Sequence, residues 1–231
     1  MNSIAVIPAR GGSKRIPRKN VKNFLGKPII GYAIQNAIDS NLFSEVYVST
    51  DDEEIKDISE SFGARCDWLR SDRLSDDFAT TSDVIYDTIC KLSENHFEYL
   101  CCIYPATPLL KINHIRSGFD LIVSNEWDFV FAATPVHENY FRSFIEQESK
   151  GLRMLFPEFE KERTQDLPIG YLDAGQFYWG KREAWESAKP IFSQHSTIVK
   201  GKANEFVDID TIDDWERAES MFKERAANTN D

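Results

Sequence analysis

The sequence predicts an α/β fold with a doubly wound, mostly parallel sheet. Short β-rich segments alternate with helical segments over the first 135 residues. The predicted strands are apolar nearly throughout, which is typical of strands that are covered on both faces. With 231 residues, of which 42% are hydrophobic and 13% aromatic, the chain can bury the core of one large domain.

The expected elements follow one another in a regular order up to residue 135. Strands are expected at 3–8 (SIAVIP), 45–50 (EVYVST), 64–69 (ARCDWL), 99–104 (YLCCIY) and 129–134 (FVFAAT). Helices are expected between them, near 28–40, 52–62, 81–94 and 112–125. Because ligands of doubly wound sheets bind at the carboxyl ends of the strands, the residues that directly follow the strands are the first candidates for a site.

After Pro135 the alternation breaks down. Residues 136–172 are polar, charged and irregular, so we interpret them as a small arm inserted in a single domain that spans residues 1–231. Strands at 174–179 and 204–209 are expected to rejoin the sheet, and a helix near 212–225 closes the domain.

The formal net charge of −11 is unevenly distributed along the chain. Residues 1–38 contain seven Lys or Arg and no Asp or Glu, so the remaining residues carry −18. The strong negative charge of these remaining residues argues against a nucleic acid or an anionic membrane as the partner. We therefore interpret the basic opening segment as a local site for a small anion, with a merely solvated charged face as the alternative.

Other composition features exclude several classes of protein. No apolar segment approaches the ~20 residues of a membrane span, and the first apolar run, IAVI, is shorter than the ~7–15 residues of a signal-peptide core. The chain is therefore expected to be cytoplasmic. The four cysteines form no CxxC pair and the four histidines lack zinc-site spacing, so buried thiols are expected and a zinc site is not.

The opening loop, PARGGSKRIPRKN at residues 8–20, has the chemistry of a polyphosphate site. Gly11 and Gly12 let the backbone approach a ligand, and consecutive N–H groups can form a nest for an anion that the neighbouring cations neutralise. The loop is neither a Walker A motif nor a GxGxxG motif, so those two mechanisms are not supported. An ordinary basic turn remains the alternative.

A second constellation is Asp208-Ile209-Asp210 near the end of the chain. Two residues apart on an extended segment, the carboxylates face the same side, and hard oxygen ligands suit Mg²⁺ bound together with phosphate oxygens. The alternative is that Asp210 or Thr211 caps the helix that follows. Two other acidic doublets, Asp51-Asp52 and Asp76-Asp77, are expected to form caps and turns.

The segment IPARGGSKRIPRKNVKNFLGKPIIGYAI, residues 7–34, resembles the signature of the cytidylyltransferases that activate nine-carbon sialic-type sugars. The likeness continues through VSTDDEEI, WLRSDRLSDDFATTSDVI, YPATPLL, DAGQFYWG and FVDIDTIDDWERAE, so it spans nearly the whole chain. The resemblance implies a Rossmann-like nucleotidyltransferase fold of the nucleotide-diphospho-sugar transferase type. It also implies Mg²⁺ as the cofactor and a homodimer formed through the arm.

The implied reaction joins CTP to a nine-carbon 2-keto sugar acid, for surface or flagellar glycan synthesis. The anomeric hydroxyl of the sugar attacks the α-phosphorus in line, and pyrophosphate leaves. By the resemblance, Arg10, Ser13 and Lys19 hold the triphosphate together with the loop glycines, and Asn20 lies near the α-phosphate and the sugar. Arg10 and Lys19 also stabilise the departing pyrophosphate.

The resemblance assigns further roles outside the loop. Asp208 and Asp210 match the metal-binding pair of the family, and one of them or the metal activates the sugar hydroxyl. Arg70 and Ser82 match positions that contact the base or the ribose. The alternatives are that Arg70 forms a surface ion pair and that Ser82 caps a helix.

Within this family, the branch that acts on pseudaminic acid is the most similar. Its features are a Tyr-Pro stretch, a [Ser/Thr]-Gln-Asp-Leu run and DAGQFYW, which occur here at 104–108, 164–167 and 173–179. The sialic acid branch usually has Gln-Pro-Thr-Ser-Pro at the first of these. The residues expected to contact the sugar are Tyr104, Arg163, Gln165, Gln176 and Tyr178.

Several alternatives stay open at this point. Gln176 and Tyr178 share one face of their predicted strand, where they can bind acetamido groups or simply be hydrated. The sugar can be another 2-keto acid, of the N-acetylneuraminic, legionaminic or KDO type. A glycosyltransferase that uses nucleotide sugars and a nucleotide-binding regulator without activity are the remaining candidates.

Overall fold

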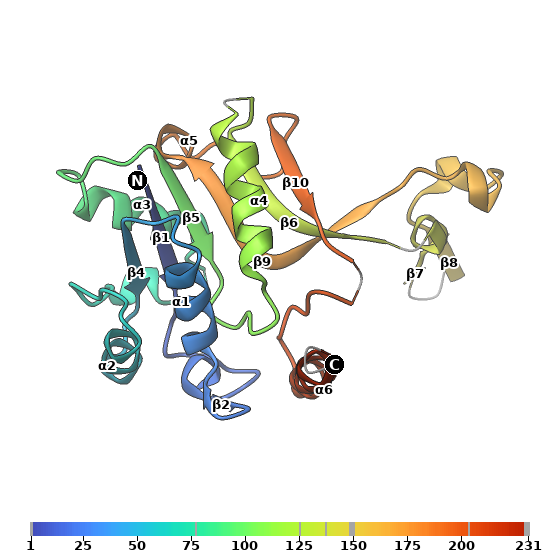
Figure 1. The fold of residues 1–231 in the computed structure, drawn as a ribbon. Helices are drawn as coiled ribbons and strands as arrows, with labels where there is room; N and C mark the ends of the chain where they lie inside the picture. The colour runs from blue at the N-terminus through green and yellow to red at the C-terminus, as the bar shows by residue number, and fades with distance from the viewer. Residues whose placement is uncertain are drawn as a thin grey trace.

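The computed structural model describes residues 2–76, 78–124, 126–136, 138–147, 151–202 and 204–228. A six-stranded sheet in the order β10-β6-β9-β5-β1-β4 forms its centre (Figure 1). The strands of this sheet are β1 (Ser3–Pro8), β4 (Glu45–Ser49), β5 (Tyr99–Ile103), β6 (Phe129–Pro135), β9 (Tyr171–Lys181) and β10 (Ser196–Lys200). The helices are α1 (Ile30–Asp39), α2 (Glu53–Ser61), α3 (Thr81–Lys91), α4 (Ile112–Val123), α5 (Arg182–Glu186) and α6 (Ile212–Asn228).

The predicted fold class is confirmed. Strand β1 pairs in parallel with β4 and β5, and β10 pairs in parallel with β6. Strand β9 is the exception, because it runs antiparallel to both β5 and β6 between which it lies. The carboxyl ends of β1 and β5 therefore lie side by side, and the loops that follow them are the natural position for a ligand.

Successive residues of β1 enter two different hydrophobic cores, because side chains alternate between the faces of a strand. Ala5 and Ile7 belong to the core on the side of α1 and α4, whereas Ile4 and Val6 belong to the core that includes residues of α3 and α5. All four side chains are at most 2% exposed. Helices therefore cover both faces of the sheet, as the continuous apolar strands predicted.

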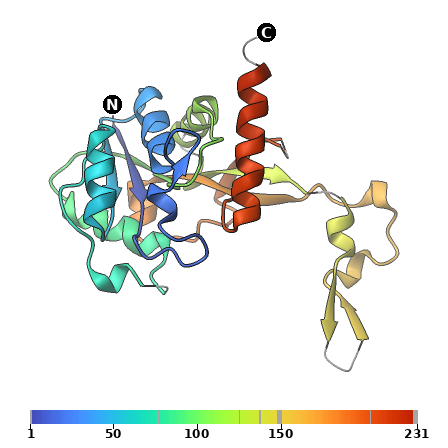
Figure 2. The ribbon, with the colours of Figure 1, turned by 90° about the horizontal axis from the view of Figure 1, so that it is seen from below.

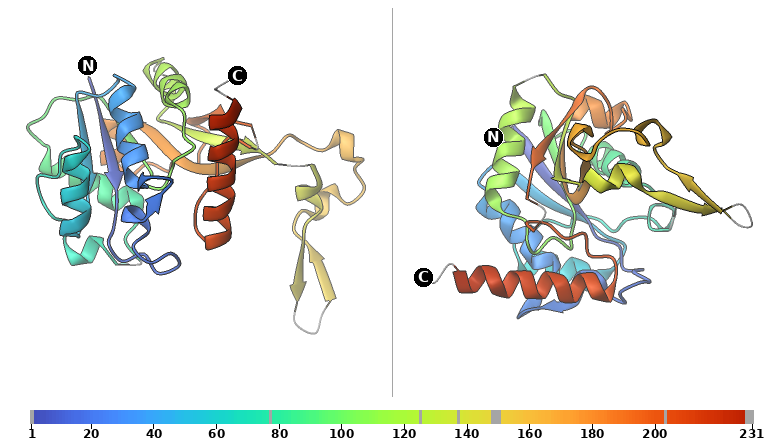
Figure 3. Two further views of the ribbon diagram at one scale, coloured as in Figure 1. Left: turned by 60° about the horizontal axis from the view of Figure 1, so that its bottom comes forward. Right: turned by 90° about the vertical axis from the view of Figure 1, so that its right-hand side faces the viewer.

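A third core joins the two ends of the sequence. Helix α6 packs its Trp215 and Phe222 rings against Phe24, with ring centroids 5.4 and 5.7 Å apart. Phe24 lies in a small ribbon formed by β2 (Asn23–Phe24) and β3 (Lys27–Pro28), directly after the opening loop. Figures 2 and 3 show the long helix α6 alongside this N-terminal region. This packing holds the segment before α6 close to the opening loop.

Two predicted strands are wrong. Residues 64–69 form only isolated bridges beside the edge strand β4, at Arg65 and Leu69. Residues 204–209 form no strand in the part that the structure describes, because their apolar side chains pack into the first and third cores instead of joining a ladder. The strand next to β6 is instead β10, which the sequence analysis missed.

The segment between β6 and β9 projects away from the sheet (Figures 1 and 2, and Figure 3, left). It contains a hairpin of β7 (Phe144–Gln147) and β8 (Gly151–Met154). Tyr140, Phe141 and Phe156 pack against one another with ring centroids 5.4–6.0 Å apart. A small aromatic cluster therefore holds this arm together, outside the three main cores. Among the described residues no helix has the length and apolar character that crossing a bilayer requires.

Candidate nucleotide-binding and catalytic site

Two adjoining cavities open at the carboxyl ends of β1 and β5. The first has a volume of about 250 Å³, and the second has a volume of about 340 Å³. Pro8, Arg10 and Pro105 line both of them, so Arg10 lies at their junction. This is the position at which a doubly wound sheet is expected to bind its ligand.

The second cavity is lined mainly by the opening loop. Lys19 donates a hydrogen bond of 2.7 Å from Nζ to the carbonyl oxygen of Ile209, and its Nζ lies 3.5 Å from Asp210 Oδ1. Arg15 Nη2 lies 2.7 Å from the same carboxylate oxygen. The loop and the acidic segment, which stand at opposite ends of the sequence, therefore meet at one cavity. The further residues that line it are Ser13, Lys14 and Asn20.

Asn20 is 5% exposed and offers an acceptor at this cavity. Its Nδ2 donates to the carbonyl oxygen of Arg10 at 3.0 Å, which fixes the orientation of the amide. Its Oδ1 is buried and has no hydrogen-bond partner among the described residues. A buried polar atom without a partner is costly, so a donor from a bound ligand is the natural complement.

The loop glycines differ in part from the expected phosphate nest. The N–H of Gly11 donates to Asp51 Oδ1 at 2.9 Å, so it is already engaged within the protein. A Cβ atom at Gly11 would lie 2.7 Å from Asp52 Oδ2, so glycine is required here for close approach to Asp52. Neither Gly11 nor Gly12 lines the second cavity, whose cationic lining comes from side chains. Asp52 caps α2 by accepting from the N–H of Ile55, as predicted for that doublet.

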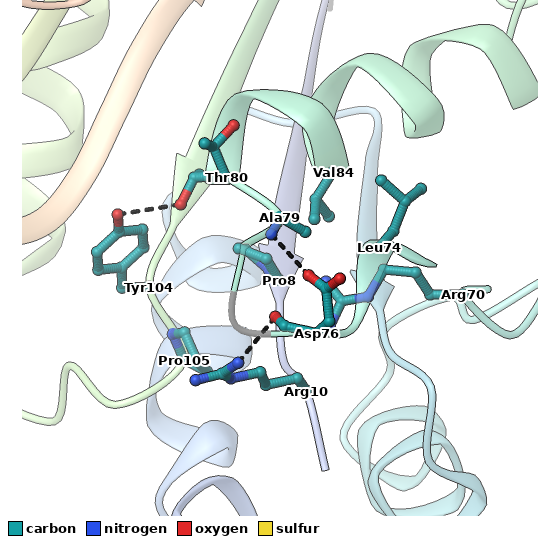
Figure 4. A pocket seen from close by; sticks show the side chains of 11 residues that line it. Pro8, Arg10, Arg70, Leu74, Asp76, Ala79, Thr80, Val84, Tyr104 and Pro105 are labelled. Atoms are coloured by element: carbon teal, nitrogen blue, oxygen red, sulfur yellow. Dashed lines mark hydrogen bonds between the residues drawn. The ribbon is translucent and has the colours of Figure 1, made fainter. Parts of the chain in front are cut away.

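The first cavity has Arg70 in its wall (Figure 4). The residue is 6% exposed, and burial lowers the pKa of its guanidinium. Its Nε donates to Ser75 Oγ at 3.3 Å, and its Nη2 lies 3.7 Å from Asp51 Oδ1. Arg70 is therefore a buried cation of the cavity, and the alternative of a surface ion pair is wrong.

The loop before α3 forms the other side of the first cavity. Arg10 Nη1 donates to the carbonyl oxygen of Asp76 at 2.9 Å, and the Asp76 carboxylate accepts from the N–H of Ala79 (Figure 4). Asp76 thus forms the expected turn, whereas Asp77 lies outside the described residues. Thr80 caps α3 in a capping box with Asp83, so the alternative that Ser82 caps the helix is wrong.

Asp208 and Asp210 differ in their surroundings. Asp210 is held by the two cations described above, whereas Asp208 has no hydrogen-bond or ion-pair partner in the described part of the chain. The pKa of Asp208 is raised. The main cause is that the surrounding protein partly shields the carboxyl group from water, although the residue as a whole is exposed, and the negative charges of Asp210 and Asp173 add to the effect. A bound cation stabilises an unpaired carboxylate that lies among other carboxylates, because it offsets their mutual repulsion.

The capping alternative holds for Thr211 but not for Asp210. Thr211 caps α6, and Asp214 Oδ2 accepts from the N–H groups of Thr211 and Asp210 at 2.9 and 3.2 Å. Both predicted carboxylates are thus left outside the cap. Across the described residues no group of three or more His, Cys, Asp or Glu could hold a metal ion. Mg²⁺ at nucleotide sites commonly uses one or two carboxylates together with substrate phosphates, and this pair fits that donor set.

The residues predicted to contact the sugar are only partly brought together. Tyr104 lines the first cavity, and its phenol oxygen lies 3.2 Å from Thr81 Oγ1. The Tyr178 ring packs beside it, with ring centroids 5.3 Å apart. Gln176 is 1% exposed, and its amide Nε2 donates to the carbonyl oxygen of Ala174 at 2.7 Å. Gln176 therefore acts inside the protein, where its Oε1 has no partner among the described residues.

Arg163 and Gln165 lie elsewhere, at a short helical turn of the arm (Thr164–Asp166). Both are exposed, and Arg163 Nε pairs with Asp166 Oδ2 at 2.7 Å. Because the arm projects away from the sheet, neither residue lines the two cavities of its own chain (Figure 1).

Comparison with known proteins decides the family. The cytidylyltransferase family model matches residues 4–221. The chain belongs to the cytidylyltransferase family. A pseudaminic acid cytidylyltransferase of Campylobacter jejuni is 41% identical over 225 residues, which are 96% of this chain and 97% of that protein. A CMP-N,N'-diacetyllegionaminic acid synthase of Legionella pneumophila is 32% identical over 231 residues, again 96% and 97% of the two chains.

The fold of this cytidylyltransferase is also found among solved structures. A CMP:2-keto-3-deoxy-manno-octonic acid synthetase in complex with CTP superposes with a TM-score of 0.75, over 97% of this chain and 100% of the other. The two sequences are 14% identical, so the likeness establishes the fold. It agrees with the nucleotidyltransferase fold that the sequence resemblance implied.

Several residues of the first cavity in this cytidylyltransferase were not predicted. Ala79, Thr80 and Thr81 line it beside Arg70. Thr80 was within reach of sequence analysis, since T-x-x-D before an apolar helix is a capping-box pattern. Such a pattern places the start of a helix, and helix starts at the carboxyl edge of a sheet commonly face ligands.

Proposed function

We propose that this chain transfers CMP from CTP to the anomeric hydroxyl of pseudaminic acid, with release of pyrophosphate. The observation that carries the proposal is the joined pair of cavities, of which the second is lined by cations of the opening loop and by Asp210 of the acidic pair. The similarity over nearly the full length to a relative named pseudaminic acid cytidylyltransferase supports the choice of sugar.

In this proposal the base and ribose of CTP occupy the first cavity, and the triphosphate occupies the second. Arg10 lies at the junction, so it can neutralise phosphate charge next to the reacting α-phosphorus. Lys19 and Ser13 line the second cavity, where they can bind the departing pyrophosphate. Fixed cations at the position where charge develops lower the barrier, because they need little reorganisation during the reaction.

Asp208 and Asp210 are the residues that would hold Mg²⁺. A bound Mg²⁺ would neutralise phosphate charge and lower the pKa of a nearby hydroxyl. Lys19 Nζ and Arg15 Nη2 hold Asp210 in place on the side of the phosphates. Our candidate activator of the attacking hydroxyl is one of these two carboxylates or the metal itself.

The sugar is proposed to lie beyond the α-phosphate, near Tyr104 and Tyr178. Arg163 and Gln165 can reach it only from a second copy of the chain, because they lie on the projecting arm. We therefore propose a homodimer in which the arm of one chain completes the site of its partner. The exposed apolar side chains Phe144 (58%) and Leu152 (70%) of the arm hairpin and Ile169 (78%) in the segment before β9 support an interface along the arm.

We also propose that the enzyme works in the cytoplasm. All four cysteines are free thiols; Cys66, Cys101 and Cys102 are buried as expected, whereas Cys90 is exposed. Free thiols are usual in reducing compartments.

The decisive experiment measures pyrophosphate release with CTP, UTP, ATP and GTP against a panel of 2-keto sugar acids. The proposal expects turnover with CTP and pseudaminic acid. Faster turnover of legionaminic or N-acetylneuraminic acid would assign the chain to another branch of the family. Binding of CTP without turnover of any sugar acid would instead favour a regulator. Light scattering of the purified chain, with Leu152→Asp as the interface variant, tests the dimer.

A further inference from the structure

Asp173 is an acidic residue close to the proposed site, and none of the roles described above uses it. It lies in β9, opposite Ala133 of β6, where the pairing of the two strands shifts register. Its carboxylate engages two donors of its own strand: the phenol of Tyr178 donates to Oδ2, and the N–H of Gly175 donates to Oδ1 at 3.2 Å. The residue is exposed, so further lone pairs of the carboxylate face solvent.

One side of Asp173 is connected to the nucleotide cavity. Tyr178 is 3% exposed, and its ring packs against that of Tyr104. Tyr104 in turn contacts Thr81 in the wall of the first cavity. Desolvation raises the pKa of both phenols, and in Tyr178 the neighbouring Tyr104 and the bond to Asp173 raise it further, so both phenols keep their protons.

The carboxylate sets the direction of this chain of groups. An ionised carboxylate can only accept hydrogen bonds, so the proton of Tyr178 points to Asp173. The single proton of the Tyr178 hydroxyl is then used, so its oxygen can only accept a hydrogen bond from any further group. Rotation of this phenol group is thereby restricted, and a restricted hydroxyl discriminates among ligand groups better than a freely rotating one.

The other side of Asp173 adjoins the acidic pair. Gly175 has a φ of +58°, and a Cβ atom built on it would lie 3.0 Å from Asp208 Cγ. Asp208 therefore lies directly against the turn that Asp173 holds through the N–H of Gly175. The two residues are close enough for Asp173 to contribute to the raised pKa of Asp208.

We propose that Asp173 is a positioning residue for the acceptor sugar, which acts through Tyr178 and Tyr104. The sugar must lie between the α-phosphate, at the junction of the cavities, and the acidic pair. The chain from Asp173 through Tyr178 to Tyr104 leads from the turn beside Asp208 to the wall of the first cavity, where Tyr104 directly precedes Pro105 at the junction. This inference rests on the proposed function, because it concerns the sugar side of that reaction.

The test compares Asp173→Asn, Tyr178→Phe and the double variant. Tyr99→Phe is the matched control, because Tyr99 is the first residue of β5 and Tyr104 follows the other end of that strand. Tyr178→Phe removes one hydroxyl and keeps the ring packing. We expect each single variant to lower kcat/KM for the sugar by about tenfold, the value of one hydrogen bond to a charged group. The double variant is expected to lose no more than the worse single variant, since the two residues act as one unit.

A second measurement separates positioning from a general structural role. Titration calorimetry with CTP should give the same dissociation constant for all variants and for the control, because neither Asp173 nor Tyr178 lines the two cavities. Additive losses in the double variant, an unchanged kcat/KM for the sugar, or an equal loss of CTP affinity would each overturn the inference. A wild-type chain that releases no pyrophosphate with any sugar acid would overturn the proposed function and the inference together.

Discussion

Lys19 Nζ lies 3.5 Å from Asp210 Oδ1 and donates to the carbonyl oxygen of the preceding residue, Ile209. One lysine thus joins the basic opening loop to the acidic segment that precedes the last helix. The chain has a net charge of −11 but carries seven cations within its first 38 residues. Four of these cations, Arg10, Lys14, Arg15 and Lys19, line a phosphate-sized cavity, and Asp210 of the acidic pair lies in the same lining.

Arg10→Ala is expected to weaken CTP binding by at least about tenfold. The guanidinium lies at the junction of the two cavities, and a charge-assisted hydrogen bond to phosphate contributes about 1.5–3 kcal/mol. Titration calorimetry measures the change. Arg182→Ala is the matched control, because Arg182 bonds to Asn95 and Glu186 and lines neither cavity. Equal CTP affinity in both variants would remove Arg10 from the site.

Glu205→Gln is expected to destabilise the protein at neutral pH. The Lys111 ammonium at 2.8 Å and the N–H of Lys202 lower the pKa of Glu205 to about 2 from an ordinary 4.5. A depressed folded-state pKa stabilises the fold above about pH 4.5, and the gain is lost as pH falls toward 2.

The expected loss for Glu205→Gln is roughly 1–3 kcal/mol at pH 7 and smaller at pH 3, measured by urea unfolding. Glu216→Gln on the exposed side of α6 is the control and should change little. A loss that stays constant between pH 7 and pH 3 would contradict the ion pair as its cause.

Much of the fold was predictable because it depends on local patterns. The apolar strands β1, β4, β5 and β6 and the helices between them are visible in the hydrophobic periodicity. The direction of β9 was not predictable, because an antiparallel strand in the middle of the sheet depends on how the long arm returns. Residues 204–209 look like a strand, but their apolar side chains fill space beneath α6.

The site was predictable where one segment carries several of its groups. The opening loop and the acidic pair are such segments, and the structure brings them together. The buried state of Arg70 depends on long-range packing. The contact of Tyr178 with Asp173 depends on the local twist of the strand at Gly175. No spacing rule reports such contacts, because they join side chains whose positions follow from the tertiary structure.

The enzyme is expected to prefer pseudaminic acid to N-acetylneuraminic acid. Tyr104 stands where the sialic acid branch usually has Gln, and its ring packs on Tyr178, so this wall of the site is aromatic. A site built to bond particular polar substituents of its substrate can reject an analogue that leaves the site's own buried polar groups unpaired by as much as ~10⁴-fold. The ratio of kcat/KM for the two sugars measures the preference. Equal or better turnover of N-acetylneuraminic acid contradicts it.

Asp208→Asn is expected to raise the melting temperature of the protein in the absence of metal and nucleotide. The folded-state pKa of Asp208 is raised, so its ionisation costs stability, and this cost grows as pH rises through that pKa. Removing the charge should therefore stabilise the fold at pH 7 and have less effect at pH 4. Thermal unfolding at the two pH values, with Asp120→Asn on the exposed surface of α4 as the control, provides the check.

Asp208→Asn and Asp210→Asn are each expected to abolish most turnover while the fold survives. Asn keeps the shape of the side chain but removes an anionic ligand, and Mg²⁺ at nucleotide sites depends on few carboxylates. Pyrophosphate release across a Mg²⁺ titration measures the loss, and circular dichroism checks the fold. Asp214→Asn is the matched control, because Asp214 accepts the hydrogen bonds at the start of α6. It should lower the melting temperature and leave turnover at saturating Mg²⁺ nearly unchanged. Near-normal activity of both Asp208→Asn and Asp210→Asn at low Mg²⁺ would falsify the metal role, because the loss of a metal ligand must raise the Mg²⁺ concentration that the enzyme needs.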